Sequence, residues 1–441
     1  MLKSLDLVLI ITYFIIVLFI GWRSSRKENN QGFLVGNRQV GILSLNATVS
    51  ASLTGGSAIA AYIALLYLWG FSVFWIFIGA SIGLLVFIPF ATKIKKEGDV
   101  QGHLTLLDFT YKKFGRRNTT LAASLFLVVF LMIILAEMII GGKIFSVVTG
   151  FPYWLSVIIC SLVIFVYIYL GGVKSDIKTD LFQYAAFFFL FIIGFNLLKT
   201  TTLSTLQFDF FSMGAVQIIV AVIMGILGVF VSADVWQKIY AAKNVDSVRK
   251  GFFYAAISFL IVTFFITIIG LIIKVNFPNV NPNDAMIAGF SSLPSGLLGL
   301  GIIAILAATM STIDTGLIVS SLFISRDIIS RYKTISEEKL VKLTKLFIVV
   351  LWLFATGVAI LTGNLVFVFY NLFSFILILA PAVVCSFFFN LKKRAIQYSL
   401  LIGILSALML AFSGNITSDY IVLPFFVSLI ILGIAQKLVR E

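Results

Sequence analysis

Long apolar runs, separated by short polar and basic segments, make up most of this chain. A run of about 20 apolar residues can cross the hydrocarbon of a bilayer as a helix. Thirteen such runs lie near residues 5–22, 41–68, 71–94, 119–147, 152–171, 178–199, 211–236, 249–274, 290–325, 338–362, 364–389, 395–413 and 418–436. Lipid offers backbone amides no hydrogen-bond partners, and the sequence lacks the short alternating strands of a membrane barrel. The pattern predicts an all-α membrane protein with about 13 transmembrane helices.

Composition supports a lipid environment. Of the 441 residues, 61% are hydrophobic and 11% are charged, which is more apolar material than a soluble core of this length can bury. The net charge of +14 does not indicate a nucleic-acid partner, because no stretch is long enough to form a basic soluble domain. No nucleophile–base pair, metal cluster or phosphate loop indicates an enzyme.

The basic residues predict the orientation of the chain. If the N-terminus is outside, all 32 Lys and Arg residues except Lys3, Lys143, Lys199 and Lys274 fall on the inner side, with Lys238 placed in an inner loop. This asymmetry follows the positive-inside rule. We expect a protein of the cell (plasma) membrane with its N-terminus outside, its C-terminus in the cytoplasm and an odd number of spans. No cleavage pattern follows the run 5–22, so we interpret it as an anchor.

The span count suggests an internal repeat. We expect one transmembrane domain over 1–440, in which 5–22 is an extra N-terminal helix and 395–436 forms two extra C-terminal helices. The other ten spans divide into two groups of five, at 41–199 and 211–389. Because five is odd, the second group enters the membrane upside down relative to the first. This parity is typical of inverted-repeat transporters, in which the leading helix of each half is broken near the midplane.

Both leading spans contain small residues that suit such a break. The first has a small polar stretch from Ser50 to Ser57 with adjacent glycines, and the second has Gly225 and Gly228 before Ser232. Glycine lowers the cost of unwinding a helix. Small residues also let membrane helices pack closely, and both interpretations stay open here.

Four acidic residues lie within the apolar runs: Glu137, Asp180, Asp234 and Asp314. An ionisable group inside a span is costly and marks a functional candidate. Asp180 and Asp234 lie near the inner ends of their spans, where solvation explains them equally well. Glu137 and Asp314 lie deeper.

The ninth span carries oxygen ligands on one face. Ala308, Ser311, Thr312 and Thr315 share that face by their three- and four-residue spacing, and Asp314 borders it. Hydroxyls on an intact helix, together with carbonyls released by a broken one, suit a small hard cation. The alternative is that these hydroxyls bond back to their own helix.

Several motifs in order resemble those of the sodium:solute symporter family, whose members carry sugars, proline, pantothenate, sialic acid, urea and other solutes. The matching stretches are 32–38 (GFLVGNR), 104–115 (LTLLDF followed by KFG), 171–183 (GGV followed by TD and Gln183), 236–244 (WQK followed by AAKN) and 304–311 (AILAATMS). The resemblance covers nearly the whole chain.

The resemblance implies a ten-helix core of the leucine-transporter type and sodium-coupled import of a small organic solute by alternating access. Its sodium site lies between the first and eighth core helices. Carried over by position, the Na⁺ ligands are the carbonyls of Ala51, Thr54 and Ala308 and the hydroxyls of Ser311 and Thr312.

Some family members have a second cation site, which here corresponds to Asp180, Ser311, Asp314 and Thr315. Asp314 replaces a small polar residue of the family at this position. Its carboxylate could strengthen cation binding, carry a proton in a proton-coupled transporter, or balance a cationic solute.

By the same analogy, five positions face the solute: Ser52, Gly55, Ser57, Ser232 and Asn371. They offer hydrogen bonds without a fixed positive charge, so a neutral or cationic solute fits better than a dianion. A membrane solute sensor without transport and an uncoupled channel are the other functions to test.

Overall fold

The computed structural model describes residues 3–26, 30–200, 206–330, 333, 335–361, 365–413 and 420–439. Three basic residues assigned to the inner side, Lys27, Arg331 and Arg440, lie outside the described residues. So do residues 414–417 between the last two expected spans and the first two residues of the expected span 418–436. Within them the chain is helical, and Val40 and Ala242 form one isolated parallel β-bridge. The expected all-α architecture is confirmed.

The α-helices follow one another along the chain with short connections. They are α1 (Ser4–Ser25), α2 (Asn30–Val35), α3 (Ile42–Leu53), α4 (Gly56–Trp69), α5 (Trp75–Gln101), α6 (Leu106–Phe114), α7 (Arg116–Thr149), α8 (Tyr153–Ala186), α9 (Phe188–Thr200), α10 (Ala215–Val231), α11 (Ala233–Ala241), α12 (Val245–Asn276), α13 (Ala285–Ser291), α14 (Leu297–Leu322), α15 (Glu337–Leu361), α16 (Leu365–Ile376), α17 (Ala380–Cys385), α18 (Lys393–Ser413) and α19 (Leu423–Leu438). Short 3₁₀ turns lie at Gly36–Arg38, Gly70–Phe74, Pro282–Asp284 and Leu377–Leu379, and a π-helical segment lies at Phe323–Ile329.

The described residues contain eight helical stretches long and apolar enough to cross a membrane, or nine if the bent pair α10 and α11 is one span. Two of these stretches, 56–101 and 153–199, have 46 and 47 residues. At 1.5 Å per residue each is about 70 Å long, more than twice the roughly 30 Å of hydrocarbon, so each exceeds one crossing. The chain is an integral membrane protein, and the count of thirteen stays a prediction.

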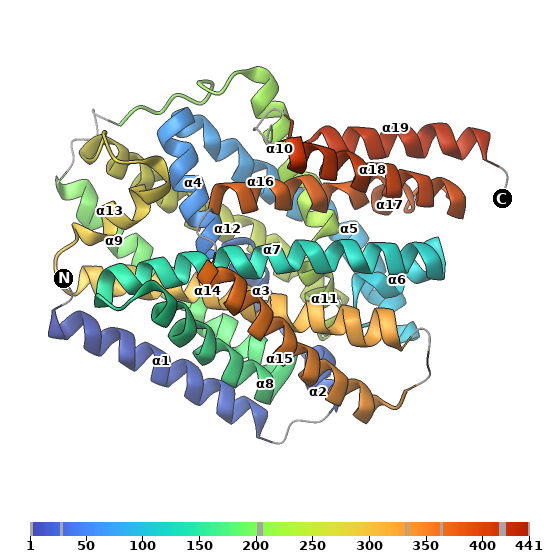
Figure 1. The fold of residues 1–441 in the computed structure, drawn as a ribbon, viewed down its shortest axis with the longest axis horizontal. Helices are drawn as coiled ribbons and strands as arrows, with labels where there is room; N and C mark the ends of the chain where they lie inside the picture. Colours follow the sequence, from blue (N-terminus) through green and yellow to red (C-terminus); the bar gives the residue numbers. More distant parts are fainter. Residues whose placement is uncertain are drawn as a thin grey trace.

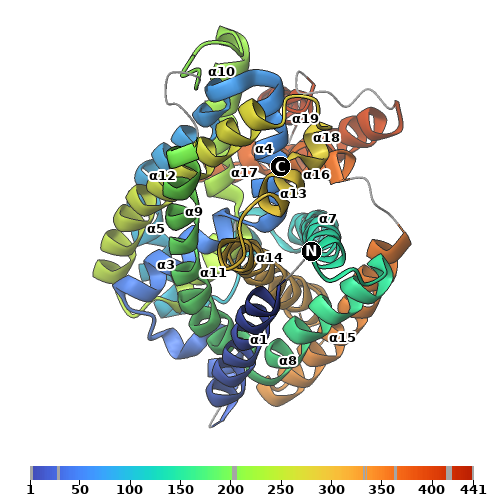
Figure 2. The ribbon, with the colours of Figure 1, turned by 90° about the vertical axis from the view of Figure 1, so that its left-hand side faces the viewer.

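Helix α14 lies at the centre of the bundle. Of the most apolar window in the stretch Leu297–Ile329, 94% is buried. Helices α1, α7, α8 and α15 pack around it, while α18 and α19 lie side by side at the end of the molecule that carries the C-terminus (Figures 1 and 2). A polar side chain on α14 is therefore placed where several helices can reach it.

Helix α8 differs from the expected pair of spans. Its direction changes at Gly172 (φ 51°, ψ −145°), where the expected span 152–171 ends, but the helix resumes at once and runs to Ala186. A Cβ atom at Gly172 would lie 2.6 Å from the carbonyl oxygen of Phe33 on α2, so only glycine allows this turn and this contact. The prediction of a loop between residues 171 and 178 is thus wrong, and Asp176 lies on a buried helical turn.

Candidate functional site

The first leading span is broken, which is one of the two interpretations that its small residues left open. Helix α3 ends at Leu53, Thr54 and Gly55 have non-helical backbone angles, and α4 begins at Gly56. The amide of Thr54 donates to the carbonyl of Ala51 (3.0 Å), which closes the end of α3. Among the described residues, no backbone amide donates a hydrogen bond to the carbonyl of Thr54. The break therefore leaves at least one backbone oxygen available to a ligand.

Gly55 and Gly56 allow the broken segment to pack closely against α7 and α14. A Cβ atom on Gly55 would lie 2.2 Å from Oε1 of Glu137 and 2.9 Å from Oγ1 of Thr312. A Cβ atom on Gly56 would lie 2.1 Å from Oγ1 of Thr309. Both distances to Glu137 and Thr309 are far below van der Waals contact, so no larger residue fits without displacing these groups.

Two of the expected sodium ligands, Ser311 and Thr312, lie on the turn of α14 that meets this break. Thr312 lies at the break and donates to the carbonyl of Ala308 (3.1 Å), so its hydroxyl oxygen can still accept a cation. Ser311 donates to Oδ1 of Asp180 (2.7 Å), and Oδ2 of Asp180 accepts from Thr48 on α3. Asp180 thereby links α14 to the helix that precedes the break. The oxygens are of the kind that holds a small hard cation.

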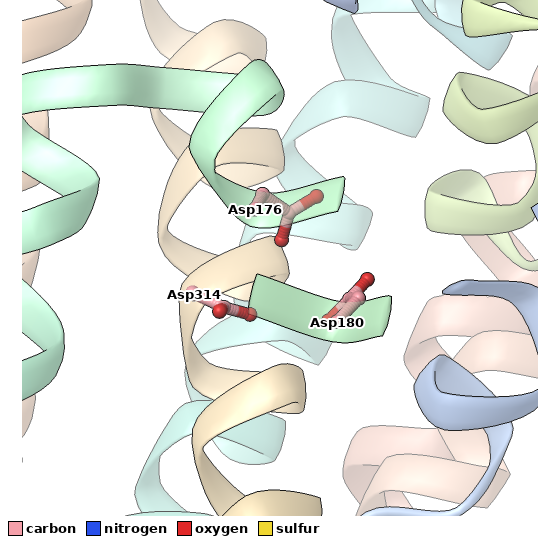
Figure 3. A group of neighbouring side chains, drawn as sticks. All are labelled: Asp176, Asp180 and Asp314. Carbon is pink, nitrogen blue, oxygen red and sulfur yellow. The ribbon is translucent and has the colours of Figure 1, made fainter. Parts of the chain in front are cut away.

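Three carboxylates converge beside Ser311. Asp176 and Asp180 from α8 and Asp314 from α14 bring one oxygen each within 4.8 Å of one another, and all three side chains are buried (Figure 3). Asp314 accepts from the hydroxyl of Tyr167 (2.8 Å) and from the amide of Thr315 (2.7 Å). Such a cluster cannot stay charged in a membrane interior without a cation.

Lys238 of α11 supplies that cation. Its ammonium contacts Asp176 and lies 3.3 Å from Oδ2 of Asp180 and 3.2 Å from Oγ1 of Thr315, with no side-chain exposure. Thr315 in turn donates to Oδ1 of Asp176 (2.7 Å). The assignment of Lys238 to an inner loop is wrong: α11 resumes directly after the second break and carries Lys238 into the interior.

The second leading span is broken at Ser232 (φ −71°, ψ 99°), where α10 and α11 meet at 47°. Its two glycines lie elsewhere. A Cβ atom on Gly225 would lie 2.5 Å from the backbone nitrogen of Ala80 on α5, whereas one on Gly228 would meet nothing within 4 Å. Gly225 therefore serves close helix packing, and the break itself occurs at a serine whose hydroxyl donates to Asp234 (2.5 Å).

A cavity of about 330 Å³ lies beside the first break. Leu53 and Ala58, which flank the break, line it together with residues of α5, α10 and α12. None of the five expected solute positions is among its lining residues. Ser57 bonds to Glu137, Ser232 bonds to Asp234, and Asn371 is buried in α16. The Ser52 hydroxyl is buried without a partner among the described residues, and Gly55 faces Glu137 and Thr312.

Comparison with known proteins decides the family. The model of the sodium:solute symporter family matches residues 33–407, most of the chain. This chain belongs to the sodium:solute symporter family. As a symporter it is similar to the osmoregulated proline transporter OpuE of Bacillus subtilis, with 21% identity over 97% of this chain and 94% of the relative. Sodium/proline symporter 2 of Staphylococcus saprophyticus is 28% identical over 40% of this chain and 36% of its own length.

The fold is also that of this family. A Na⁺-coupled sialic acid symporter, solved in a substrate-bound outward-open state, superposes with a TM-score of 0.83 over 100% of this chain and 98% of its own, at 17% identity. Mhp1 in an inward-facing conformation superposes with a TM-score of 0.58 over 90% of each chain, at 15% identity. Sodium is thus the co-transported ion, and the leucine-transporter type of fold is confirmed.

Sequence reasoning about this symporter missed two residues of the carboxylate cluster. Asp176 lies four residues before Asp180, and on a helix this spacing places both side chains on one face. Lys238 follows the break at Ser232 by six residues, too close to be in a loop if the helix resumes. Both signals were present, but the expected loop between 171 and 178 concealed the first and the positive-inside assignment concealed the second.

Proposed function

We propose that this chain imports a small organic solute together with one sodium ion across the cell membrane by alternating access. In this proposal the N-terminus is outside, and the repeats 41–199 and 211–389 form the moving core. The single observation that carries the proposal is the break at Thr54–Gly55, held against Thr312 of the buried helix α14.

Sodium would bind where the broken helix meets α14. The proposed ligands are the carbonyls of Ala51, Thr54 and Ala308 and the hydroxyls of Ser311 and Thr312. The available carbonyl of Thr54 and the position of Thr312 support this set. Because the ligands come from two separate helices, an ion bound between them would stabilise the arrangement in which those helices are close.

The second cation site of some family members would hold no ion in this chain. The ammonium of Lys238 already lies among Asp180, Thr315 and Asp176, where such an ion would bind, and like charges repel at this distance. Asp314 accepts hydrogen bonds from the hydroxyl of Tyr167 and the amide of Thr315, so both of its oxygens already have partners within the protein. A stoichiometry of one sodium follows.

One ion is enough for useful accumulation. Moving one charge across a membrane potential of 100 mV releases about 2.3 kcal/mol, which supports a solute gradient of about 50-fold before any sodium gradient is added. Coupling requires that sodium and solute raise each other's affinity, so solute should bind more tightly when sodium is present.

The proposal is tested with purified protein in proteoliposomes. Uptake of radiolabelled proline, pyrrolidine, glycine betaine and choline is measured with an inward sodium gradient and with an equal potassium gradient. We expect at least one solute to accumulate in sodium only, and the melting temperature of the protein to rise with sodium. Equal uptake in both salts, or single-channel currents in place of accumulation, would rule out a symporter.

A further inference from the structure

Glu137 of α7 lies at the start of α4, on the far side of the break. Its Oε2 accepts a hydrogen bond from the backbone amide of Ser57 (2.9 Å), and its Oε1 accepts one from the hydroxyl of Ser57 (2.6 Å). The side chain is 1% exposed. A carboxylate of the protein itself therefore occupies the first turn of the half-helix that the break creates.

The N-terminal end of α4, where Glu137 lies, is a favourable position for an anion. The first amides of a helix have no partner within it, and the helix dipole places partial positive charge there, so an anion binds well. In transporters with broken helices, such ends point at anionic groups of the substrate. Here the anion is already present, and Gly55 leaves only the space that Oε1 of Glu137 fills. A carboxylate of the solute would find this position taken.

The lining of the adjacent cavity offers a carboxylate no cationic side chain among the described residues. Among the described residues that line it there is no Lys, Arg, His, Asp or Glu, and Gln217 provides its one side-chain amide. The hydroxyl of Tyr62, another lining residue, is already 2.7 Å from Oγ1 of Thr267. Five of the lining residues are aromatic: Tyr62, Trp69, Phe77, Phe259 and Phe373. Aromatic faces attract cations, most strongly where water is excluded.

The carboxylate and the cavity are neighbours along α4. Leu53 and Ala58 line the cavity, and the residues between them carry both the break and the contact to Glu137. A positive group in the cavity would thus lie across the broken backbone from Glu137, whose buried carboxylate needs such a cation to stay ionised. At low dielectric this attraction is much stronger than it would be in water.

We propose that the solute of this symporter is a compact organic cation without a carboxylate, for which Glu137 is the fixed counter-charge. The inference rests on the proposed function and names the solute class of the same site. It separates this chain from relatives whose names specify proline, because proline brings its own carboxylate.

Two matched pairs of probes isolate the carboxylate. Choline and glycine betaine share a trimethylammonium group, and pyrrolidine and proline share a ring; in each pair only the second compound has a carboxylate. Binding is measured by the thermal shift of the purified full-length protein in sodium, and uptake is measured in proteoliposomes. We expect at least one cation to bind at least about tenfold more tightly than its carboxylate partner, because that partner adds an unpaired buried charge.

Glu137→Gln tests whether the residue sets this preference. Glutamine keeps the shape and accepts the bond from the Ser57 amide, and its NH2 group can donate to the Ser57 hydroxyl, but it removes the charge. The ratio of cation affinity to carboxylate affinity should fall at least about tenfold. Asp6→Asn is the matched control, because Asp6 is a buried carboxylate that accepts the amides of Gly296 (2.7 Å) and Gly299 (2.9 Å) at the start of α14, far along the chain from the cavity. It should leave the ratio unchanged.

Each outcome decides the question. The inference is overturned if proline or glycine betaine binds as well as its partner, if neither member of either pair binds, or if the ratio is the same in Glu137→Gln and wild type. Sodium-driven uptake of proline would overturn the inference while leaving the proposed function intact. A variant that no longer folds is recognised by the absence of a melting transition; Glu137→Asp, which keeps the charge, must then retain the cation preference.

Discussion

The two broken helices of this symporter are built differently. At the first break, glycine lies in the break itself, and the gap it leaves is filled by Glu137 and Thr312 from other helices. At the second break the backbone leaves the helix at Ser232, and Gly225 lies almost two turns earlier against the backbone of α5. One break is shaped around ligand groups, while the other is shaped by helix packing.

The difference assigns separate tasks to the two breaks. In the proposed mechanism the first break presents backbone oxygens to a cation, and in the structure it presents the amide of Ser57 to Glu137. The second directs α11 so that Lys238 reaches Asp176 and Asp180. We therefore expect changes at the first break to alter sodium and solute binding directly. Changes at the second break should act on the carboxylate cluster or on stability.

The largest effect should come from Gly55→Ala. The added methyl group would displace Glu137 and Thr312, and overpacking of this kind costs about 1–3 kcal/mol, so sodium-driven uptake should fall by up to about 100-fold. Gly433→Ala in α19, where a Cβ atom meets nothing within 4 Å, is the control and should transport normally. Normal sodium affinity in Gly55→Ala would show that the break is not a ligand site.

An intermediate effect on sodium binding is expected when Lys238, whose ammonium takes the place of a second cation in the proposal, is removed. Lys238→Met combined with Asp314→Ser removes the ammonium and restores a small polar residue at position 314, so the remaining carboxylates need an added cation. The sodium dependence of the thermal shift should become steeper, with a Hill coefficient rising from about 1 toward about 2. An unchanged hyperbolic dependence in the folded variant would refute the role of Lys238 as a built-in cation.

The smallest effect on sodium should come from Gly225→Ala. Its methyl group would collide with backbone atoms of α5, which cannot move without separating the helices, so the melting temperature should fall by several degrees. Sodium affinity should change by less than about threefold, because the first break is untouched. A large loss of sodium affinity at normal stability would mean that the two breaks share one task.

The sequence was most informative where local chemistry sets the structure. Apolar runs of membrane length identified the helices, and the small residues from Ser50 to Ser57 located the first break. The spacing on α14 predicted that Ser311 and Thr312 share a face, and the family resemblance placed that face at the first break. Ser311 bonds to Asp180, with which the resemblance also grouped it.

The features of the site that the sequence did not predict depend on tertiary packing. Gly225 and Gly228 have the same local signal as Gly55, but only the neighbouring α5 shows that Gly225 serves packing. Lys238 follows the charge rule for inner loops, although its partners on α8 make burial favourable. Glu137 was recognised as a deep acid, but its partner Ser57 lies 80 residues away in sequence, and no local pattern encodes that contact.

The most direct test of the account is a sodium titration of the double variant Ser311→Ala and Thr312→Ala, followed by calorimetry or thermal shift. Ser320→Ala with Ser321→Ala, two buried hydroxyls farther along α14, is the matched control. The account predicts that sodium affinity falls at least about tenfold in the first variant and is unchanged in the control, because only the first removes cation ligands. Wild-type sodium affinity in the first variant would contradict it.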